Sequence, residues 1–319
     1  MHAYLDFERP IAELEGKIVE LQQLASADPT MQLDAEVSRL QQKADQLVKD
    51  TYAKLTPWQK VQVARHPARP HFSDYVKQLF DEFTPLAGDR AFGEDQAIIT
   101  ALGRFRGHAV AVVGQEKGND TKSRLQHNFG MAMPEGYRKV QRLFTMANRF
   151  GLPVISLVDT SGAYSGVAAE DRGQAEAIAR TIEACLDIRV PFVATIIGEG
   201  GSGGAVAIAT ANRVYMLENS VYSVISPEGC ASILWRRPEK AQDAAATLRI
   251  TAQDLFGFGV IDGIIPEPVG GAHRGPVEAI GMVGDQIARA LSEMSNLSPE
   301  EVRRQRREKF LAIGRDLAK

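Results

Sequence analysis

The first 55 residues carry two apolar stripes with helical spacing. Apolar residues recur at intervals of three and four in two sets: Ile11, Leu14, Ile18 and Leu21, then Leu33, Val37, Leu40, Ala44 and Leu47. Each set places one apolar stripe on a helix. The turn-forming residues ASADPT (25–30) between the sets indicate a helical hairpin. We therefore expect a helical arm over residues 1–55 that packs on the body of the protein or on a partner.

From about residue 95 the pattern changes to short apolar runs separated by helical segments. The runs at 97–102, 109–114, 153–159 and 191–197 predict strands, and the segments 135–149, 170–186 and onward from 203 predict helices. Apolar strands that alternate with helices are typical of an α/β protein whose sheet is covered on both faces.

A helix-rich tail follows from about residue 275. It contains the basic run VRRQRREK (302–309). Basic runs on helices usually face water, so we expect this one to form a solvated face.

Composition and charge exclude several classes of protein. Lys and Arg number 37 and Asp and Glu 40, which gives a net charge of −3 and no basis for nucleic acid or an anionic membrane as the main partner. The two cysteines, Cys185 and Cys230, are too few for a disulfide framework or a Cys-rich zinc site. The N-terminal sequence MHAYLDFERP lacks a basic start followed by an apolar run. We expect a cytoplasmic protein.

Two predicted strands end in glycine-bearing turns, VDTSGAYSG (158–166) and IIGEGGSGGA (196–205). Loops that follow strands and lead into helices are where α/β proteins usually place ligands. In GEGGSGGA (198–205) five of eight residues are glycine, and one or two would suffice for close packing. Backbone N–H groups at a helix N-terminus can face a ligand directly and favour negative charge. The second turn therefore predicts an oxyanion hole.

Two other motifs match the same turn. Gly198, Gly200 and Gly203 satisfy the GxGxxG pattern of dinucleotide-binding proteins, and Glu218 lies twenty residues after Gly198, although the intervening helix is short. A phosphate-binding P-loop is disfavoured because Ala205 stands where that motif requires lysine.

A serine hydrolase is the other alternative. Gly200, Ser202 and Gly204 form the GxSxG pattern of a nucleophile elbow, and Asp262 and His273 follow in the order of a catalytic triad.

Few other side chains near the turns suggest catalysis. Asp159 is expected to cap its own loop rather than to act as a base. Lys117, Lys122 and Arg124 are expected to form a solvated face, and the alternative is contact with phosphates of coenzyme A or acidic residues of a carrier protein. This favours catalysis by backbone dipoles on a substrate that becomes an oxyanion or enolate.

The sequence resembles a known family along nearly its whole length, the α subunit of the bacterial multi-subunit acetyl-CoA carboxylase carboxyltransferase. The matching stretches are LDFERPIAELEGKI (5–18), ARHPARP (64–70), FDEFTPLAGDR (80–90), NFGMAMPEGYRK (128–139), DTSGAYSG (159–166), RGQAEAIAR (172–180), GEGGSGGA (198–205), SVISPEGCASILW (223–235) and IIPEPVGGAHR (264–274).

The resemblance implies an α/β fold of the crotonase-like (ClpP/crotonase) class, a spiral of repeated ββα units. With the arm and tail, this divides the chain into residues 1–55, a carboxyltransferase domain over 56–296 and a helical tail over 297–319. It also implies transfer of a carboxyl group from carboxybiotin, on a biotin carboxyl carrier protein, to acetyl-CoA. The product is malonyl-CoA, in the first committed step of fatty acid synthesis. A scaffold subunit without catalytic groups is the alternative.

Site residues follow from the same resemblance. The backbone N–H groups of Gly203 and Gly204 are expected to face the biotin ureido oxygen. Gly200 and Gly201 are expected to shape the approach to that site.

Gly162, Ala163 and Tyr164 are expected to line the substrate site from the first turn. Relatives usually read DTPGAYPG there, whereas Ser161 and Ser165 replace both prolines in this chain. Losing a well-placed proline costs about 0.4 to 1 kcal/mol of folding free energy, so this loop is expected to be looser than in relatives.

The resemblance further implies that catalysis requires a homologous β subunit in an α2β2 arrangement. The β subunit is expected to hold the thioester-binding half and a four-cysteine zinc ribbon, which leaves this chain without a metal or a covalent cofactor. Biotin carboxylase is expected in the full complex.

Overall fold

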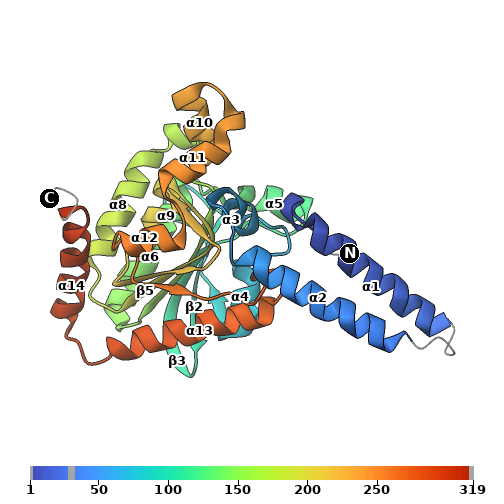
Figure 1. Ribbon diagram of the computed structural model, residues 1–319. Coiled ribbons are helices and arrows are strands. Elements are labelled where there is room, and N and C mark those ends of the chain that lie inside the picture. Colours follow the sequence, from blue (N-terminus) through green and yellow to red (C-terminus); the bar gives the residue numbers. More distant parts are fainter. Residues whose placement is uncertain (1–2, 28–32, 316–319) are drawn as a thin grey trace.

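A mixed eight-stranded sheet lies at the centre of the molecule (Figure 1). The computed structural model describes residues 3–27 and 33–315. The strands are β1 (Phe80–Pro85), β2 (Ile98–Phe105), β3 (His108–Gln115), β4 (Val154–Thr160), β5 (Phe192–Gly201), β6 (Arg213–Leu217), β7 (Val221–Ser223) and β8 (Gly263–Ile265). Their spatial order is β1-β2-β3-β4-β5-β6-β8, and β7 pairs with the end of β5. The pairs β1–β2 and β2–β3 are antiparallel, and every pairing beyond β3 is parallel.

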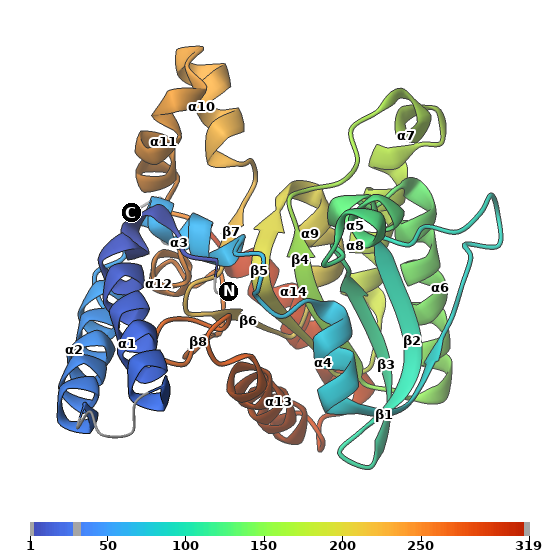
Figure 2. The ribbon, with the colours of Figure 1, turned by 90° about the vertical axis from the view of Figure 1, so that its right-hand side faces the viewer.

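Helices cover both faces of this sheet (Figure 2). They are α1 (Arg9–Ala27), α2 (Asp34–Tyr52), α3 (Pro57–Ala64), α4 (Phe72–Leu79), α5 (Thr121–Gln126), α6 (Pro134–Phe150), α7 (Val167–Asp171), α8 (Gln174–Asp187), α9 (Ser202–Ala209), α10 (Pro227–Trp235), α11 (Ala241–Leu248), α12 (Ala252–Gly257), α13 (Pro276–Glu293) and α14 (Pro299–Ala312). α6, α8 and α9 enclose one apolar core against the sheet, and α4 and α13 enclose the other. Within the described ranges, no helix is both long enough and apolar enough to span a bilayer.

The two central strands explain why the sequence shows uninterrupted apolar runs. Every residue of β4 and β5 is buried. Along β4, Val154 and Val158 point into the core under α6, whereas Ile155 and Leu157 point into the core under α13. A parallel strand with both faces covered has no polar side, so alternation disappears from its sequence.

The predicted elements are confirmed from β2 to α9, with one division and one extension. The helix predicted over 170–186 is two helices, α7 and α8, because Gly173 adopts a left-handed conformation with φ of 77° between them. The predicted strand 191–197 continues to Gly201, so β5 itself forms the first part of the glycine turn. The two-turn helices α3 and α4 and strand β1 lie where periodicity predicted no element, because eight residues are too few to show a helical repeat.

The two predicted N-terminal helices are confirmed as α1 and α2, which lie side by side and extend away from the sheet (Figures 1 and 2). Ile11 and Ile18 of α1 and Ala44 and Val48 of α2 are buried. Half of the turn predicted over 25–30 lies outside the described residues, and the other half, up to Ala27, belongs to α1. Whether residues 1–55 form a separate unit, and whether 56–296 and 297–319 do, stays a prediction.

The helical tail is present as α13 and α14, but the expectation for its basic run was wrong at one residue. Arg306 is fully buried, and its guanidinium donates to Asn212 Oδ1 and to the carbonyl oxygens of Cys185, Ile188 and Val190 at 2.8, 2.6 and 2.9 Å. The run therefore anchors α14 to the body through one arginine. Residues 316–319 of the predicted tail lie outside the described chain.

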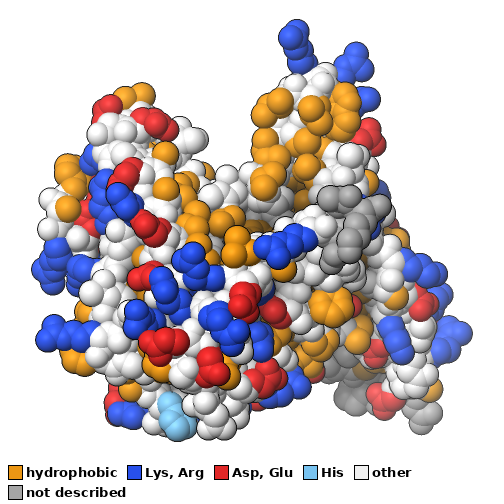
Figure 3. All heavy atoms as spheres, turned by 90° about the vertical axis from the view of Figure 1, so that its left-hand side faces the viewer, with side chains coloured by type: hydrophobic (Ala, Val, Ile, Leu, Met, Phe, Trp, Pro, Cys, Tyr) orange, Lys and Arg blue, Asp and Glu red, His pale blue; other side chains and the backbone are white. Residues whose placement is uncertain are grey.

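Two projections rise beside the carboxyl edge of the sheet, one carrying α7 and the other formed by α10 and α11 (Figure 2). Figure 3 shows a hollow between them, with apolar side chains gathered on the α10–α11 projection. Val224, Ile233 and Leu234 on this side are 77%, 71% and 64% exposed, and Val167 opposite is 78% exposed. Large apolar side chains gathered on one surface usually mark an interface with another molecule.

Candidate active site

The two glycine-bearing turns lie side by side at the carboxyl edge of the sheet. The first turn follows β4 and the second closes β5, and in these neighbouring parallel strands Thr160 pairs with Gly200. Thr160 Oγ1 lies 2.8 Å from Gly162 O and 3.1 Å from Gly162 N, which holds the first turn in a tight curve. The structure thus brings together two segments forty residues apart, as the fold class requires.

Close packing between the turns explains two of the glycines. A Cβ atom at Gly201 would lie 2.2 Å from Ser161 O, and a Cβ atom at Gly204 would lie 2.7 Å from Ala163 N. Both neighbours are backbone atoms that cannot yield without moving the chain. Gly201 and Gly204 are therefore required by the contact between the turns.

Two more glycines are explained by side chains. A Cβ atom at Gly198 would lie 2.5 Å from Asp159 Oδ1, and one at Gly200 would lie 2.8 Å from the ring of Tyr222. Packing thus accounts for four of the five glycines in 198–205, and the expectation that one or two would suffice for packing was wrong. Glycine content alone does not indicate a ligand here.

Gly203 differs from the other four. A Cβ atom there would lie 3.4 Å from Ile178 Cγ2, which is ordinary contact, and the residue is only half-buried. Ser202 begins α9 with a positive φ of 54°, a conformation that non-glycine residues seldom adopt. No side chain of the described residues caps the helix at Gly201. The first backbone N–H groups of α9, including those of Gly203 and Gly204, lack intrahelical acceptors and lie at the positive end of the helix dipole.

The N-terminus of α9 lies at the base of the hollow between the two projections (Figures 2 and 3). Gly204 is buried against the first turn, and Gly203 lies closer to the surface. The arrangement can stabilise negative charge on an oxygen atom that enters the hollow.

The first turn supplies its backbone more than its side chains. Tyr164 N donates to Ala132 O at 3.0 Å, and the Tyr164 ring folds back over Gly166, where a Cβ would lie 2.5 Å from the ring. Ser161 and Ser165, the residues that replace the family prolines, are both exposed.

Asp159 does not cap its own loop, contrary to expectation. Its Oδ1 accepts from Glu199 N in the second turn at 2.9 Å and pairs with Lys117 Nζ at 2.6 Å. The Lys117 side chain is only 17% exposed, so the predicted solvated face was also wrong at this residue. Asp159 joins the ends of β4 and β5 and the segment after β3.

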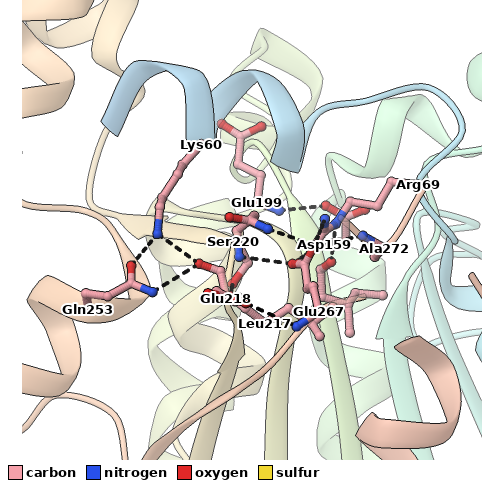
Figure 4. Close-up of polar contacts among 12 residues, drawn as sticks. Lys60, Arg69, Asp159, Glu199, Leu217, Glu218, Ser220, Gln253, Glu267 and Ala272 are labelled. Atoms are coloured by element: carbon pink, nitrogen blue, oxygen red, sulfur yellow. Dashed lines mark hydrogen bonds and ion pairs between the residues drawn. The ribbon is translucent and has the colours of Figure 1, made fainter. Parts of the chain in front are cut away.

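A buried ion pair between Arg69 and Glu267 connects β5 to the loop after β8 (Figure 4). Arg69 donates to Ile197 O at 2.7 Å and to Glu267 Oε1 at 2.6 Å, and both side chains of the pair are at most 2% exposed. Glu267 also accepts from the backbone N–H groups of Asn219 and Ala272 at 3.0 and 2.8 Å. Burial opposes the charge of Glu267, but Arg69 and these donors outweigh it and lower its pKa.

Arg65 links the glycine turn to the α10–α11 projection. Its guanidinium pairs with Glu199 and with Glu228 of α10, each at 2.6 Å. Burial favours the neutral form of Arg65, yet the two carboxylates outweigh this effect and raise its pKa. No role was predicted for Arg65 or Arg69 from the sequence. The stretch ARHPARP that contains them has no periodicity, and its signals were its match to the family and its concentration of basic residues.

The geometry contradicts the serine hydrolase alternative. His273 Nε2 lies 3.4 Å from Tyr52 OH, at the base of the N-terminal helices, and Asp262 accepts from Val214 N at 2.7 Å. Neither side chain contacts Ser202 or the other. The three residues therefore do not form a triad.

The dinucleotide alternative fails on space and charge. α9 has only eight residues, and the Asp159 carboxylate packs against Gly198, where its negative charge would repel a pyrophosphate. Glu218, the candidate ribose ligand, instead accepts from Glu267 N at 3.3 Å.

Glu8, His66 and His273 lie close enough to hold a metal ion, since their ligand atoms are within 4.8 Å of one another. However, His66 Nε2 lies 2.6 Å from Ala3 O, and His66 Nδ1 accepts from Ala68 N at 3.1 Å. Both nitrogens of His66 are therefore occupied by backbone hydrogen bonds. This group fits a structural contact better than a metal site.

Comparison with known proteins decides the family. The family model described as acetyl co-enzyme A carboxylase carboxyltransferase-like matches residues 4–314. The chain belongs to this family. It is similar to the acetyl-coenzyme A carboxylase carboxyl transferase subunit alpha of Rhizobium johnstonii, with 64% identity over 99% of this chain and 100% of the relative. The same-named subunit of Agrobacterium fabrum is 62% identical over 99% of this chain and 100% of the relative.

Solved structures of carboxyltransferases share the crotonase-like fold of this family. A transcarboxylase 12S structure with hydrolysed methylmalonyl-coenzyme A matches with a TM-score of 0.58 and 19% identity, over 71% of this chain and 42% of that one. A Pseudomonas malonate decarboxylase hetero-tetramer in complex with coenzyme A matches with a TM-score of 0.55 and 17% identity, over 70% of this chain and 88% of that one. The fold expected from the sequence is thereby confirmed.

Proposed function

We propose that this carboxyltransferase α subunit transfers the carboxyl group of carboxybiotin, carried on a biotin carboxyl carrier protein, to acetyl-CoA. The product is malonyl-CoA, for fatty acid synthesis. The observation that carries this proposal is the uncapped N-terminus of α9 at the base of the hollow, in a chain of this family. The proposed compartment is the cytoplasm.

The roles of the glycines follow from where charge develops. As the carboxyl group leaves, the biotin ureido oxygen gains negative charge, and the N–H groups of Gly203 and Gly204 donate to it. One such donor is worth about 3 to 4 kcal/mol of transition-state stabilisation. Gly200 and Gly201 keep the approach narrow, while Gly162, Ala163 and Tyr164 form the wall opposite. The freed biotin nitrogen then takes the proton from the methyl group of acetyl-CoA, and the resulting enolate carbon bonds to the released CO2, so the proposal needs no side chain as a base.

The proposal requires a second chain. The exposed apolar residues Val167, Val224, Ile233 and Leu234 border the hollow, and their burial would be favourable. We assign this surface to the β subunit in an α2β2 complex. The β subunit would supply the thioester-binding half and the zinc ribbon, and biotin carboxylase would join the full enzyme.

A pair of substitutions at Gly203 tests the role of the backbone donor. Gly203→Pro removes the N–H group, and the first turn of a helix tolerates proline because that N–H has no helical acceptor. Gly203→Ala keeps the N–H group and adds only a Cβ atom near Ile178. We expect Gly203→Pro to lower kcat by roughly a hundredfold or more and Gly203→Ala by less than about threefold.

Malonyl-CoA formation by the co-purified α and β subunits is the measurement, with thermal melting and recovery of the complex as the folding control. Gly204 is unsuitable for this test, because any side chain there displaces Ala163. Near-normal activity in a folded Gly203→Pro complex would favour the scaffold alternative, with catalysis wholly in the partner.

A further inference from the structure

A small cavity lies at the carboxyl edge of β3, β4 and β5, next to the glycine turn. Its volume is about 190 Å³, below the range of about 300 to 1,000 Å³ that holds drug-sized ligands, so it suits a single small group. It is lined by Ala64, Arg65, His66, Pro67, Arg69, His71, Lys117, Gly118, Arg124, Phe129 and Asp159. Asp159, which accepts from Glu199 N, connects it to the second turn.

Positive charge exceeds negative charge in this lining. Four of the lining residues are Lys or Arg, and Asp159 is the acidic member. Arg65 and Arg69 are neutralised by glutamates, and Lys117 pairs with Asp159. Arg124 forms no ion pair with any acidic residue of the described chain, and its Nε makes only a 3.4 Å contact with a backbone carbonyl. One lining cation is therefore left to attract an anion.

His71 supplies a second, independent observation. The residue is buried, with 9% exposure, yet neither ring nitrogen has a hydrogen-bond partner among the described residues. The nearest carboxylate oxygen, Asp159 Oδ2, is 3.9 Å from Nδ1, which is too far for a hydrogen bond. Buried polar groups are nearly always paired, so an imidazole that lines a cavity with both nitrogens free indicates a ligand there.

We propose that this cavity binds a small oxyanion, a phosphate or carboxylate group, between Arg124 and an N–H of His71. Lys117 and Glu199 N offset the charge of Asp159, so that carboxylate does not exclude the anion. Charge-assisted hydrogen bonds of this kind are the strong ones, and arginine suits oxyanions with its planar donors. The proposal does not depend on the role of Gly203 and Gly204.

Titration calorimetry on the full chain tests the site, with inorganic phosphate and sodium acetate as separate probes at constant ionic strength. We expect saturable binding of at least one ion. Arg124→Met should weaken it roughly tenfold or more, because it removes a charged donor. Lys122→Met is the matched control, since Lys122 is exposed on the same helix, does not line the cavity and loses the same charge. His71→Phe keeps the ring and deletes both nitrogens, and it should also weaken binding.

The preferred probe identifies the source of the anion. Tighter binding of phosphate indicates the phosphate group of a larger ligand, and tighter binding of acetate indicates a carboxylate. Absence of saturable binding of both ions would overturn the proposal. Equal losses of affinity in Arg124→Met and Lys122→Met would also overturn it, because they would reveal only diffuse attraction that salt screens.

Discussion

At the scale of single residues, buried ion pairs hold the segments that surround the glycine turn. Arg69 and Glu267 are far apart in the sequence, and their contact fixes the end of β5 against the loop after β8. Arg65 does the same for the second turn and α10 through Glu199 and Glu228. The turn itself contributes few side chains, so its neighbours position it.

Glu267→Gln should therefore destabilise the protein strongly. Glutamine has nearly the same shape but leaves the buried Arg69 charge uncompensated, which typically costs about 3 to 5 kcal/mol of the free energy of unfolding. Urea denaturation of the variant chain is the measurement. Glu239→Gln, at an exposed position, is the control and should change stability by less than about 0.5 kcal/mol. If both variants unfold at the same urea concentration, the buried pair does not have this role.

At the scale of elements, α14 shows how one residue can dock a helix. Its surface is largely charged and exposed, and Val302 and Arg306 are its buried residues. The Arg306 guanidinium satisfies three carbonyl groups between Cys185 and Val190, which end α8 and lead into β5. Burial lowers the pKa of Arg306 to about 10, so it stays charged at neutral pH.

Arg306→Met tests this docking. Methionine fills similar space but leaves three buried carbonyl oxygens without the Arg306 donor, at about 1 to 3 kcal/mol for each unsatisfied group before relaxation. Asn212 Oδ1 keeps only the N–H of Phe192, at 3.3 Å. We expect the melting temperature to fall by several degrees. Arg307→Met removes the same charge from an exposed neighbour and should leave the melting temperature nearly unchanged. If the Arg306→Met and Arg307→Met chains melt at the same temperature, Arg306 does not dock α14.

The elements that the sequence predicted are those with strong apolar patterns. β4 and β5 are buried throughout, and α1 and α2 carry long stripes, so each leaves a clear signal. α3, α4 and β1 are short, and the burial of Arg306 depends on carbonyl groups more than a hundred residues away. Short elements and long-range polar contacts leave no periodicity in the chain, which is why they were missed.

At the scale of the whole molecule, the sequence located the two turns but not the reason for their composition. Motif spacing placed Gly200–Gly204 and Gly162–Tyr164 after strands, and the fold brings these segments together. The close approach of Ser161 to Gly201 and the cavity around His71 arise only when separate segments meet. The spacing of residues along the sequence therefore predicts neither this close approach nor the cavity.

The junction of the N-terminal helices with the body should make the whole protein sensitive to acid. His273 lies there, and its pKa is lowered to about 3, first by burial and then by nearby cations and His66. The charged and titratable groups around it are Glu8, Tyr52, His66, Arg69, Glu267 and Arg274. The unfolded chain binds a proton at this histidine near pH 6.5, whereas the folded chain does not. Stability is therefore lost as the pH falls from about 6.5 towards 3.

At about pH 5 this loss should reach about 2 kcal/mol relative to neutral pH. His273→Phe keeps a ring to stack on His66, whose ring lies 3.9 Å away, but cannot bind the proton. Urea denaturation at both pH values should show a drop for the natural chain that exceeds the drop for His273→Phe by this amount. His108→Gln, at an exposed position, should behave like the natural chain. Equal acid sensitivity in His273→Phe and the natural chain would assign the effect to other groups, such as the buried carboxylates, and would remove the junction as its cause.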